Sequence, residues 1–173
     1  MKRIIFLFFF INLSFFANAQ ENVDEALAFQ YYQQADYEKA SVLLEKLFNQ
    51  TKNDSYFELY FNALIKIKKY KESELLLKKL IKQNPDKPQY MIALGRVYQE
   101  SGRAAEANQV YLEVINNVPK DENKIRQIAN DFYRFEAYDL AVDVFLKGRK
   151  TLADDQLFAF DLLSIYRYKK NKP

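Results

Sequence analysis

The chain lacks several residue types on which common protein chemistries depend. Among its 173 residues there is no Cys, no His and no Trp. Without Cys, disulfides and thiol nucleophiles are excluded, and without His the commonest zinc ligand and the usual general base are missing as well. Carboxylates, Lys, Tyr, Ser and Thr remain, but none of them forms a recognised catalytic or metal-binding spacing. We therefore expect no enzyme, no metal site and no cofactor.

Turn-forming residues are also scarce, with only 3 Gly and 4 Pro. A β-sandwich or β-barrel needs many tight turns, whereas a chain rich in Leu, Lys, Glu, Gln and Ala favours helices. The hydrophobic share of 49% and the aromatic share of 16% are sufficient to bury a core. The composition therefore predicts an all-α protein.

Charge of one sign is not in excess. The formal net charge is +3, and removal of Lys2 and Arg3 from the 26 basic residues would leave 24 against 23 acidic ones. Nucleic-acid binding usually requires a concentrated basic face. We expect no nucleic-acid partner.

Residues 1–19 have the features of an export signal. Lys2 and Arg3 precede an apolar run over residues 4–16, and the small residues of 17–19 follow it. An uncleaved anchor is the alternative, but the run is shorter than the ~20 residues that span a bilayer. We expect cleavage before Gln20, no membrane span afterwards and, without a Cys to carry lipid, a periplasmic or secreted bacterial protein that is not a lipoprotein.

A short phrase recurs along the remaining chain. It occupies residues 35–40, 68–73, 102–107 and 136–141, and its small final residues are 33, 34 and 34 positions apart. A constant period of this length indicates a repeat architecture. We divide residues 20–173 into units of approximately 21–53, 54–87, 88–121 and 122–155, followed by a half-unit, 156–173.

The phrase and its spacing resemble those of the tetratricopeptide repeat (TPR) family, whose period is about 34 residues. The third unit matches the family pattern best, at Met91, Leu94, Gly95, Tyr98, Gly102, Ala107, Tyr111 and Pro119. The first and fourth units have Lys52 and Ala153 in place of the terminal Pro. The resemblance implies an all-α, right-handed superhelical solenoid of helix-turn-helix repeats.

Two local signals support pairs of helices within each unit. Gly102 is suited to a left-handed conformation that ends the first helix of its unit, and Pro85 and Pro119 are placed to stop second helices. The small residues Gly95 and Ala107 lie where helices of the family approach closely. Neighbouring hairpins are then expected to stack into one continuous core.

The resemblance also implies a concave groove, lined by the first helix of each unit, in which a protein or peptide binds. The expected groove residues are Arg96, Arg126, Asn130, Tyr133, Arg134, Asn62, Lys66 and Arg167. After Arg3, every Arg occurs from Arg96 onward. Because the guanidinium fork suits carboxylates, we expect an acidic or C-terminal peptide. Glu58, Ala93 and Gln127 replace residues of the family's dicarboxylate clamp, which argues against that particular mechanism.

The half-unit is unusually apolar. We expect its helix to begin at Gln156 and to carry large apolar residues around most of its circumference through Tyr168. Residues 156–168 would then be a closing cap with exposed aromatics, or a surface covered by a second copy, a partner or a longer natural chain. The leading interpretation is an envelope scaffold that binds a protein in its groove. The alternative is a self-assembling N-terminal module of a larger envelope protein that docks through this helix.

Overall fold

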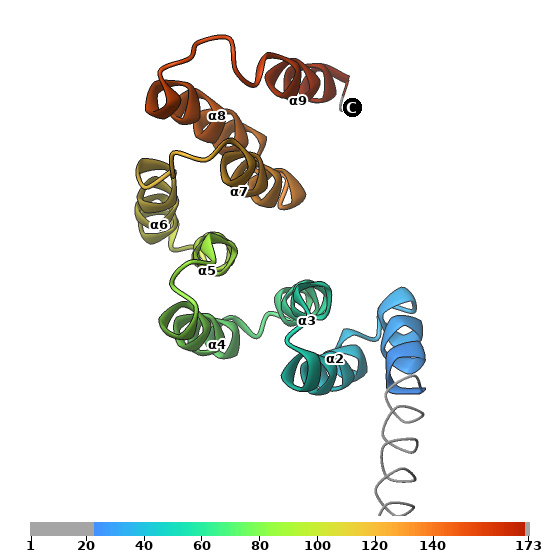
Figure 1. Cartoon of the computed structure of the whole chain (residues 1–173). Coiled ribbons are helices and arrows are strands. Elements are labelled where there is room, and N and C mark those ends of the chain that lie inside the picture. Colours follow the sequence, from blue (N-terminus) through green and yellow to red (C-terminus); the bar gives the residue numbers. More distant parts are fainter. Residues whose placement is uncertain (1–22, 172–173) are drawn as a thin grey trace, which may run out of the picture. The chain divides into compact units, whose positions relative to one another are not determined.

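The computed structural model describes residues 23–171, so the expected signal segment lies outside the described residues. All regular structure in the described range is helical (Figure 1). The helices are a segment over residues 23–33, α2 (Tyr37–Thr51), α3 (Asp54–Lys66), α4 (Tyr70–Gln83), α5 (Pro88–Glu100), α6 (Ala104–Asn116), α7 (Glu122–Arg134), α8 (Tyr138–Leu152) and α9 (Ala159–Asn171). The expected all-α class of helix-turn-helix units is confirmed. Within residues 23–171, no helix has the length and apolar character needed to cross a membrane.

The helices form two compact units, divided between Lys69 and Tyr70. In the first unit, Lys46 of α2 donates a hydrogen bond to Asp24 in the helix over 23–33, and α2 packs on α3. In the second unit, α5 packs on α6 and α7 on α8, while α4 lies against α5 and α9 against α8. The division falls inside the second expected repeat. The right-handed superhelix concerns the path of the whole chain and stays a prediction.

One residue with a positive φ angle follows the first helix of each of the four full repeats. These residues are Ala35 (φ 58°), Lys68 (φ 59°), Gly102 (φ 81°) and Glu136 (φ 59°). In each case the next N–H donates to a carbonyl five residues earlier, which closes the helix in a Schellman-type cap. The left-handed conformation expected at Gly102 is confirmed. The other three positions adopt it despite their Cβ atoms.

The second helices end in two different ways. α4 ends at Gln83, shortly before Pro85, and α6 ends at Asn116, shortly before Pro119. α2 and α8 have no such proline and end instead at left-handed cap residues, Lys52 (φ 55°) and Ala153 (φ 55°). Where the proline is missing, a residue in the left-handed conformation therefore ends the helix.

The core of the second unit depends on a close approach between Gly95 and Tyr111. A Cβ atom at Gly95 would overlap the Tyr111 ring, with Cζ only 2.8 Å away. The same ring packs edge-on against Phe132, with 5.5 Å between centroids. Burial raises the pKa of Tyr111 to about 12. One aromatic side chain from α6 therefore joins α5 and α7, and it fits because position 95 has no side chain.

Glu74 of α4 ties that helix to the turn between α5 and α6. Its carboxylate accepts hydrogen bonds from Arg103 and Lys78, each at 2.6 Å. The Arg103 guanidinium also lies over the Tyr98 ring, 4.1 Å from its centroid. The hydrogen bond from Arg103 has the largest effect and that from Lys78 the next largest, and together they lower the pKa of Glu74 to about 2. The carboxylate is therefore ionised throughout the physiological range.

Candidate functional site

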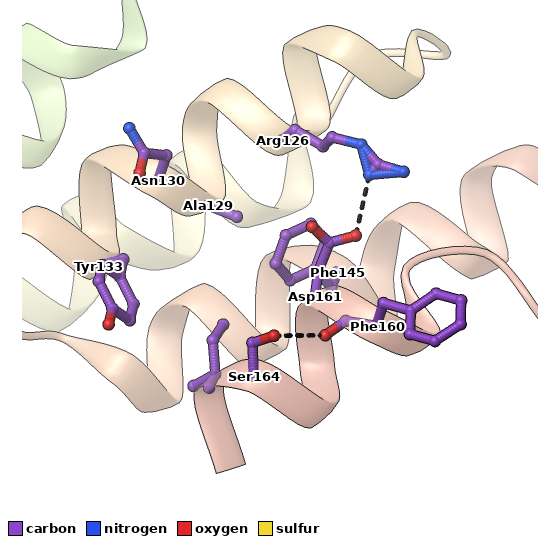
Figure 2. A pocket seen from close by; sticks show the side chains of 9 residues that line it. Arg126, Ala129, Asn130, Tyr133, Phe145, Phe160, Asp161 and Ser164 are labelled. Atoms are coloured by element: carbon purple, nitrogen blue, oxygen red, sulfur yellow. Dashed lines mark hydrogen bonds and ion pairs between the residues drawn. The ribbon is translucent and has the colours of Figure 1, made fainter. Parts of the chain in front are cut away.

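A cleft of about 440 Å³ lies between α7 and α9 in the second unit, with one side chain of α8 at its base (Figure 2). Apolar, aromatic, amide, hydroxyl and charged groups all contribute to its wall. The lining residues are Arg126, Ala129, Asn130, Tyr133, Phe145, Phe160, Asp161, Ser164 and Ile165. This mixture suits a peptide, whose backbone and side chains need both hydrogen bonds and apolar contacts.

The α7 wall follows from the spacing of residues along that helix. Arg126, Asn130 and Tyr133 are four and three residues apart, so they share one face. The opposite face carries Ile128 and Phe132, which are buried in the core and fix the helix's rotation. Arg126, Asn130 and Tyr133 therefore point into the cleft.

The α9 wall begins later than the sequence predicts. We expected a helix from Gln156, but α9 starts at Ala159. The side chain of Asp154 accepts a hydrogen bond from the Gln156 N–H at 2.8 Å, which holds this segment in a turn. Phe158 then adopts a left-handed conformation (φ 58°) and is buried against Phe145, with 4.9 Å between the ring centroids. This aromatic contact determines where the helix begins.

The apolar residues expected around α9 fall into a buried group and an exposed group in the structure. Leu162 and Ile165 of α9 are buried, whereas Phe160, Leu163, Tyr166 and Tyr168 are exposed. Phe160 is 86% exposed and lies at the edge of the cleft. One side of α9 therefore belongs to the core, while Leu163 and Tyr166 stay exposed and do not line the cleft.

An ion pair crosses the cleft. Arg126 of α7 donates to Asp161 of α9 at 2.8 Å (Figure 2). It also donates to Glu122 at 2.7 Å. Its guanidinium carbon lies 5.0 Å from the centroid of the Phe158 ring. The Arg126 fork therefore already holds two carboxylates of its own chain. An incoming carboxylate would have to compete with Asp161 for this cation.

Three tyrosines form a cluster beside the cleft. Tyr133 of α7, Tyr138 of α8 and Tyr168 of α9 contact one another pairwise, with centroid separations of 5.1, 5.3 and 5.8 Å. Lys169 of α9 forms an ion pair with Asp139 beside them. These contacts add to the Arg126–Asp161 pair in holding α9 against α7 and α8.

The structure brings together only some of the predicted groove residues. Arg126, Asn130 and Tyr133 line the cleft. Arg96 is directed instead over the Phe135 ring, 5.0 Å from its centroid. Arg134 lies 4.0 Å from Asp131, and Arg167 is exposed on α9; neither lines the cleft. Asn62 and Lys66 belong to α3, in the first compact unit.

Our sequence interpretation missed most of the α9 wall. Phe160 and Ser164 follow Arg126 and Asn130 by one repeat period, so the period alone pointed to both of them. Asp161 is different, because no pattern in the sequence indicates that it pairs with Arg126. Among the described residues, no group of three or more carboxylates is gathered as a metal site would require.

No protein-family model and no curated protein matches the chain. Several solved structures resemble it, and three of them are described here by their coverage and TM-scores. MamA MSR-1 is 20% identical over 76% of each chain, with a TM-score of 0.43. The MamA RS-1 double mutant is 14% identical, covering 88% of this chain and 78% of that one, with a TM-score of 0.46. MamA AMB-1 is 21% identical, covering 75% and 72%, with a TM-score of 0.43. At these TM-scores the likenesses carry no inference about function.

Proposed function

We propose that this protein is an interaction scaffold that binds an extended segment of a partner protein in the α7–α9 cleft. The observation that carries the proposal is the combination of groups in that cleft. Asn130 and Ser164 offer hydrogen bonds, while Tyr133 and Phe160 offer apolar contact from opposite walls. Stacked helical hairpins commonly use the surface of their first helices in this way.

The chemistry of the cleft favours an acidic segment with an apolar side chain. A carboxylate of the partner would take the place of Asp161 on Arg126, since both acceptors suit the same guanidinium fork. The ring of Phe160 lies at the edge of the same cleft and would cover an apolar neighbour of that carboxylate. Competition with Asp161 reduces the affinity for such a segment but also selects against segments without an acid.

We also propose that binding takes place outside the cytoplasm, in the bacterial envelope or beyond it. Lys2, Arg3 and the apolar run that follows them support export, and the small residues of 17–19 support cleavage. The scaffold would then act as a processed protein starting at Gln20.

A second candidate function is association through the side of α9 that faces away from the cleft. Leu163 is 62% exposed and Tyr166 is 52% exposed on that side. Exposed apolar groups gathered on one surface are typical of interaction sites. This surface is separate from the cleft, so the two functions are compatible and can be tested independently.

The cleft proposal is tested with immobilised short peptides that differ in one acidic residue and in a free or amidated C-terminus. The chain from Gln20 should bind a subset of acidic peptides, and Arg126→Ala combined with Asn130→Ala should weaken that binding at least tenfold, about 1.4 kcal/mol. Asn108→Ala, at an exposed amide on α6, is the matched control. Undiminished binding by a folded double variant would exclude the cleft as the binding site.

A further inference from the structure

Four residues form a continuous exposed stripe on α9. Ala159, Leu163, Tyr166 and Lys170 are spaced four, three and four residues apart, so they share one helix face. We call this the outer stripe. All four side chains are exposed, and the cleft lies on a different side of the helix.

The repeat period shows what normally covers this stripe. Leu163 follows Ala129 by one repeat period, and Tyr166 follows Phe132 by the same interval; both earlier residues are buried. They are buried because α8 runs back along α7, just as α6 runs back along α5. α9 repeats the apolar pattern of a covered helix, yet among the described residues no further helix packs on the outer stripe.

The charges on either side of the stripe indicate the direction of the missing helix. Asp154 and Asp155 precede α9, while Lys169 and Lys170 are in its last turn. An antiparallel copy of the same helix would place acid beside base at both ends, whereas a parallel copy would place like charges together. Antiparallel is also the direction in which α6 and α8 cover their partners.

We propose that a second copy of this chain covers the outer stripe, with α9 of the two copies packed antiparallel about a two-fold axis near Leu163. Leu163 of one copy would face Leu163 of the other, and Tyr166 would lie near Ala159. A two-fold contact closes on itself, so it produces a dimer and not a filament. This inference rests on the second candidate function, association through α9, and names a second copy of the chain as the partner. It does not depend on the cleft.

The dimer is expected to be weak. A 13-residue helix is about 20 Å long, and one helix pair buries less surface than a standard interface. We expect a dissociation constant on the order of 1–100 µM. Analytical ultracentrifugation of the chain from Gln20, between about 1 and 500 µM, covers this range.

Leu163→Glu should make the chain monomeric over the whole concentration range while its helix content and melting temperature stay unchanged. Leu112→Glu on α6 is the matched control, because Leu112 is 56% exposed and lies away from the outer stripe. The control should dimerise as the wild type does. A wild-type monomer at every concentration, or a dimer that Leu163→Glu leaves intact, overturns the proposal.

The absence of Cys allows a direct test of the two-fold axis. Leu163→Cys should form a disulfide-linked dimer under mild oxidation at concentrations where the dimer exists, whereas Leu112→Cys should stay largely unlinked. A head-to-tail contact would bring Leu163 against another part of the second copy, so Leu163→Cys would not link to itself. Growth into larger oligomers without such a link contradicts the two-fold arrangement.

A charge exchange tests the antiparallel direction. Lys170→Glu should weaken the dimer severalfold, and adding Asp155→Lys in the same chain should restore it. Asp155 precedes α9 and Lys170 is in its last turn, so nearly the whole helix separates them and they are too far apart to pair within one copy. Failure of the second substitution to restore dimerisation overturns the antiparallel pairing. Peptide binding by the monomeric Leu163→Glu variant reports separately on the cleft, so each proposal can fail without the other.

Discussion

The guanidinium of Arg126 on α7 and the carboxylate of Asp161 on α9 meet across the cleft at 2.8 Å. This pair has two consequences. It helps to position α9, the last helix of the described range. It also makes Asp161 a competitor for Arg126, which the sequence analysis predicted to bind a partner. The first prediction follows from this competition.

Asp161→Asn should increase the affinity of the cleft for acidic peptides by about five- to tenfold, or about 1–1.4 kcal/mol. The substitution keeps the shape of the side chain but removes the charge that competes for Arg126. Fluorescence anisotropy with a labelled acidic peptide measures the effect, and Asp155→Asn serves as the control for a lost surface charge. Weaker binding by the Asp161→Asn variant would argue that Asp161 itself contacts the peptide.

Gly95→Leu and Ala107→Phe should each destabilise the fold by roughly 1–3 kcal/mol. At position 95 a side chain enters the space of the Tyr111 ring, and at position 107 a phenyl group would replace a methyl group that is buried. Chemical denaturation provides the free energy of unfolding. Asn108→Leu, at an exposed position on the same helix as Ala107, should cost much less. Equal losses in all three variants would contradict the assigned close approach.

Ala35→Gly should stabilise the protein by about 0.5–1 kcal/mol. Ala35 is exposed and has φ 58°, so its Cβ is strained in the folded state and makes no compensating buried contact. Gln109→Gly, at an exposed position in the middle of α6, provides the opposite control, because Gly in a helix interior is unfavourable by up to about 1 kcal/mol. A loss of stability in the Ala35→Gly variant would mean that the left-handed turn is absent in solution.

The ionised state of Glu74 should contribute about 1–3 kcal/mol to stability at neutral pH. Its folded-state pKa is lowered to about 2 from an ordinary value near 4.5, so the unfolded chain takes up the proton first as the pH falls. The contribution is therefore complete above about pH 5 and is lost as the pH falls towards 2. Unfolding of wild type and of Glu74→Gln, compared at pH 7 and pH 3, should show a stability difference that shrinks in acid. A pH-independent difference would contradict this ionisation.

The native product should lack residues 1–19. The basic start, apolar run and small residues before Gln20 together provide the features of a cleavable signal. Intact-mass measurement of the protein isolated from its own cells decides the question. A mass that includes Lys2 and Arg3 would indicate an uncleaved, membrane-tethered form instead.

Much of the fold could be predicted from the sequence. The repeat period located the hairpins, Gly102 indicated a left-handed turn, and Pro85 and Pro119 lie just beyond two helix ends in the structure. Each of these signals acts within a few residues of its own position. The left-handed turns at Ala35, Lys68 and Glu136 carried no local signal, because these residue types do not favour a positive φ. Only their alignment with Gly102 in the repeated phrase indicated them.

The candidate site could be predicted only in part. Spacing along α7 was sufficient to place Arg126, Asn130 and Tyr133 on one face, and the period could have added Phe160 and Ser164. The direction of Arg96 towards Phe135 could not be foreseen, because it depends on the packing of a neighbouring repeat.

The sequence by itself determined that the protein is helical, that it is built from repeats of nearly constant length and that its last helix carries more apolar residues than one buried face needs. Those properties depend on composition and on the order of nearby residues. Only the tertiary structure decided that α9 starts at Ala159, that Asp161 occupies Arg126 and that Leu163 faces outward. The physical reason is that these features arise where α9 docks on α7 and α8, through contacts such as the Arg126–Asp161 pair, which joins two positions far apart in the chain.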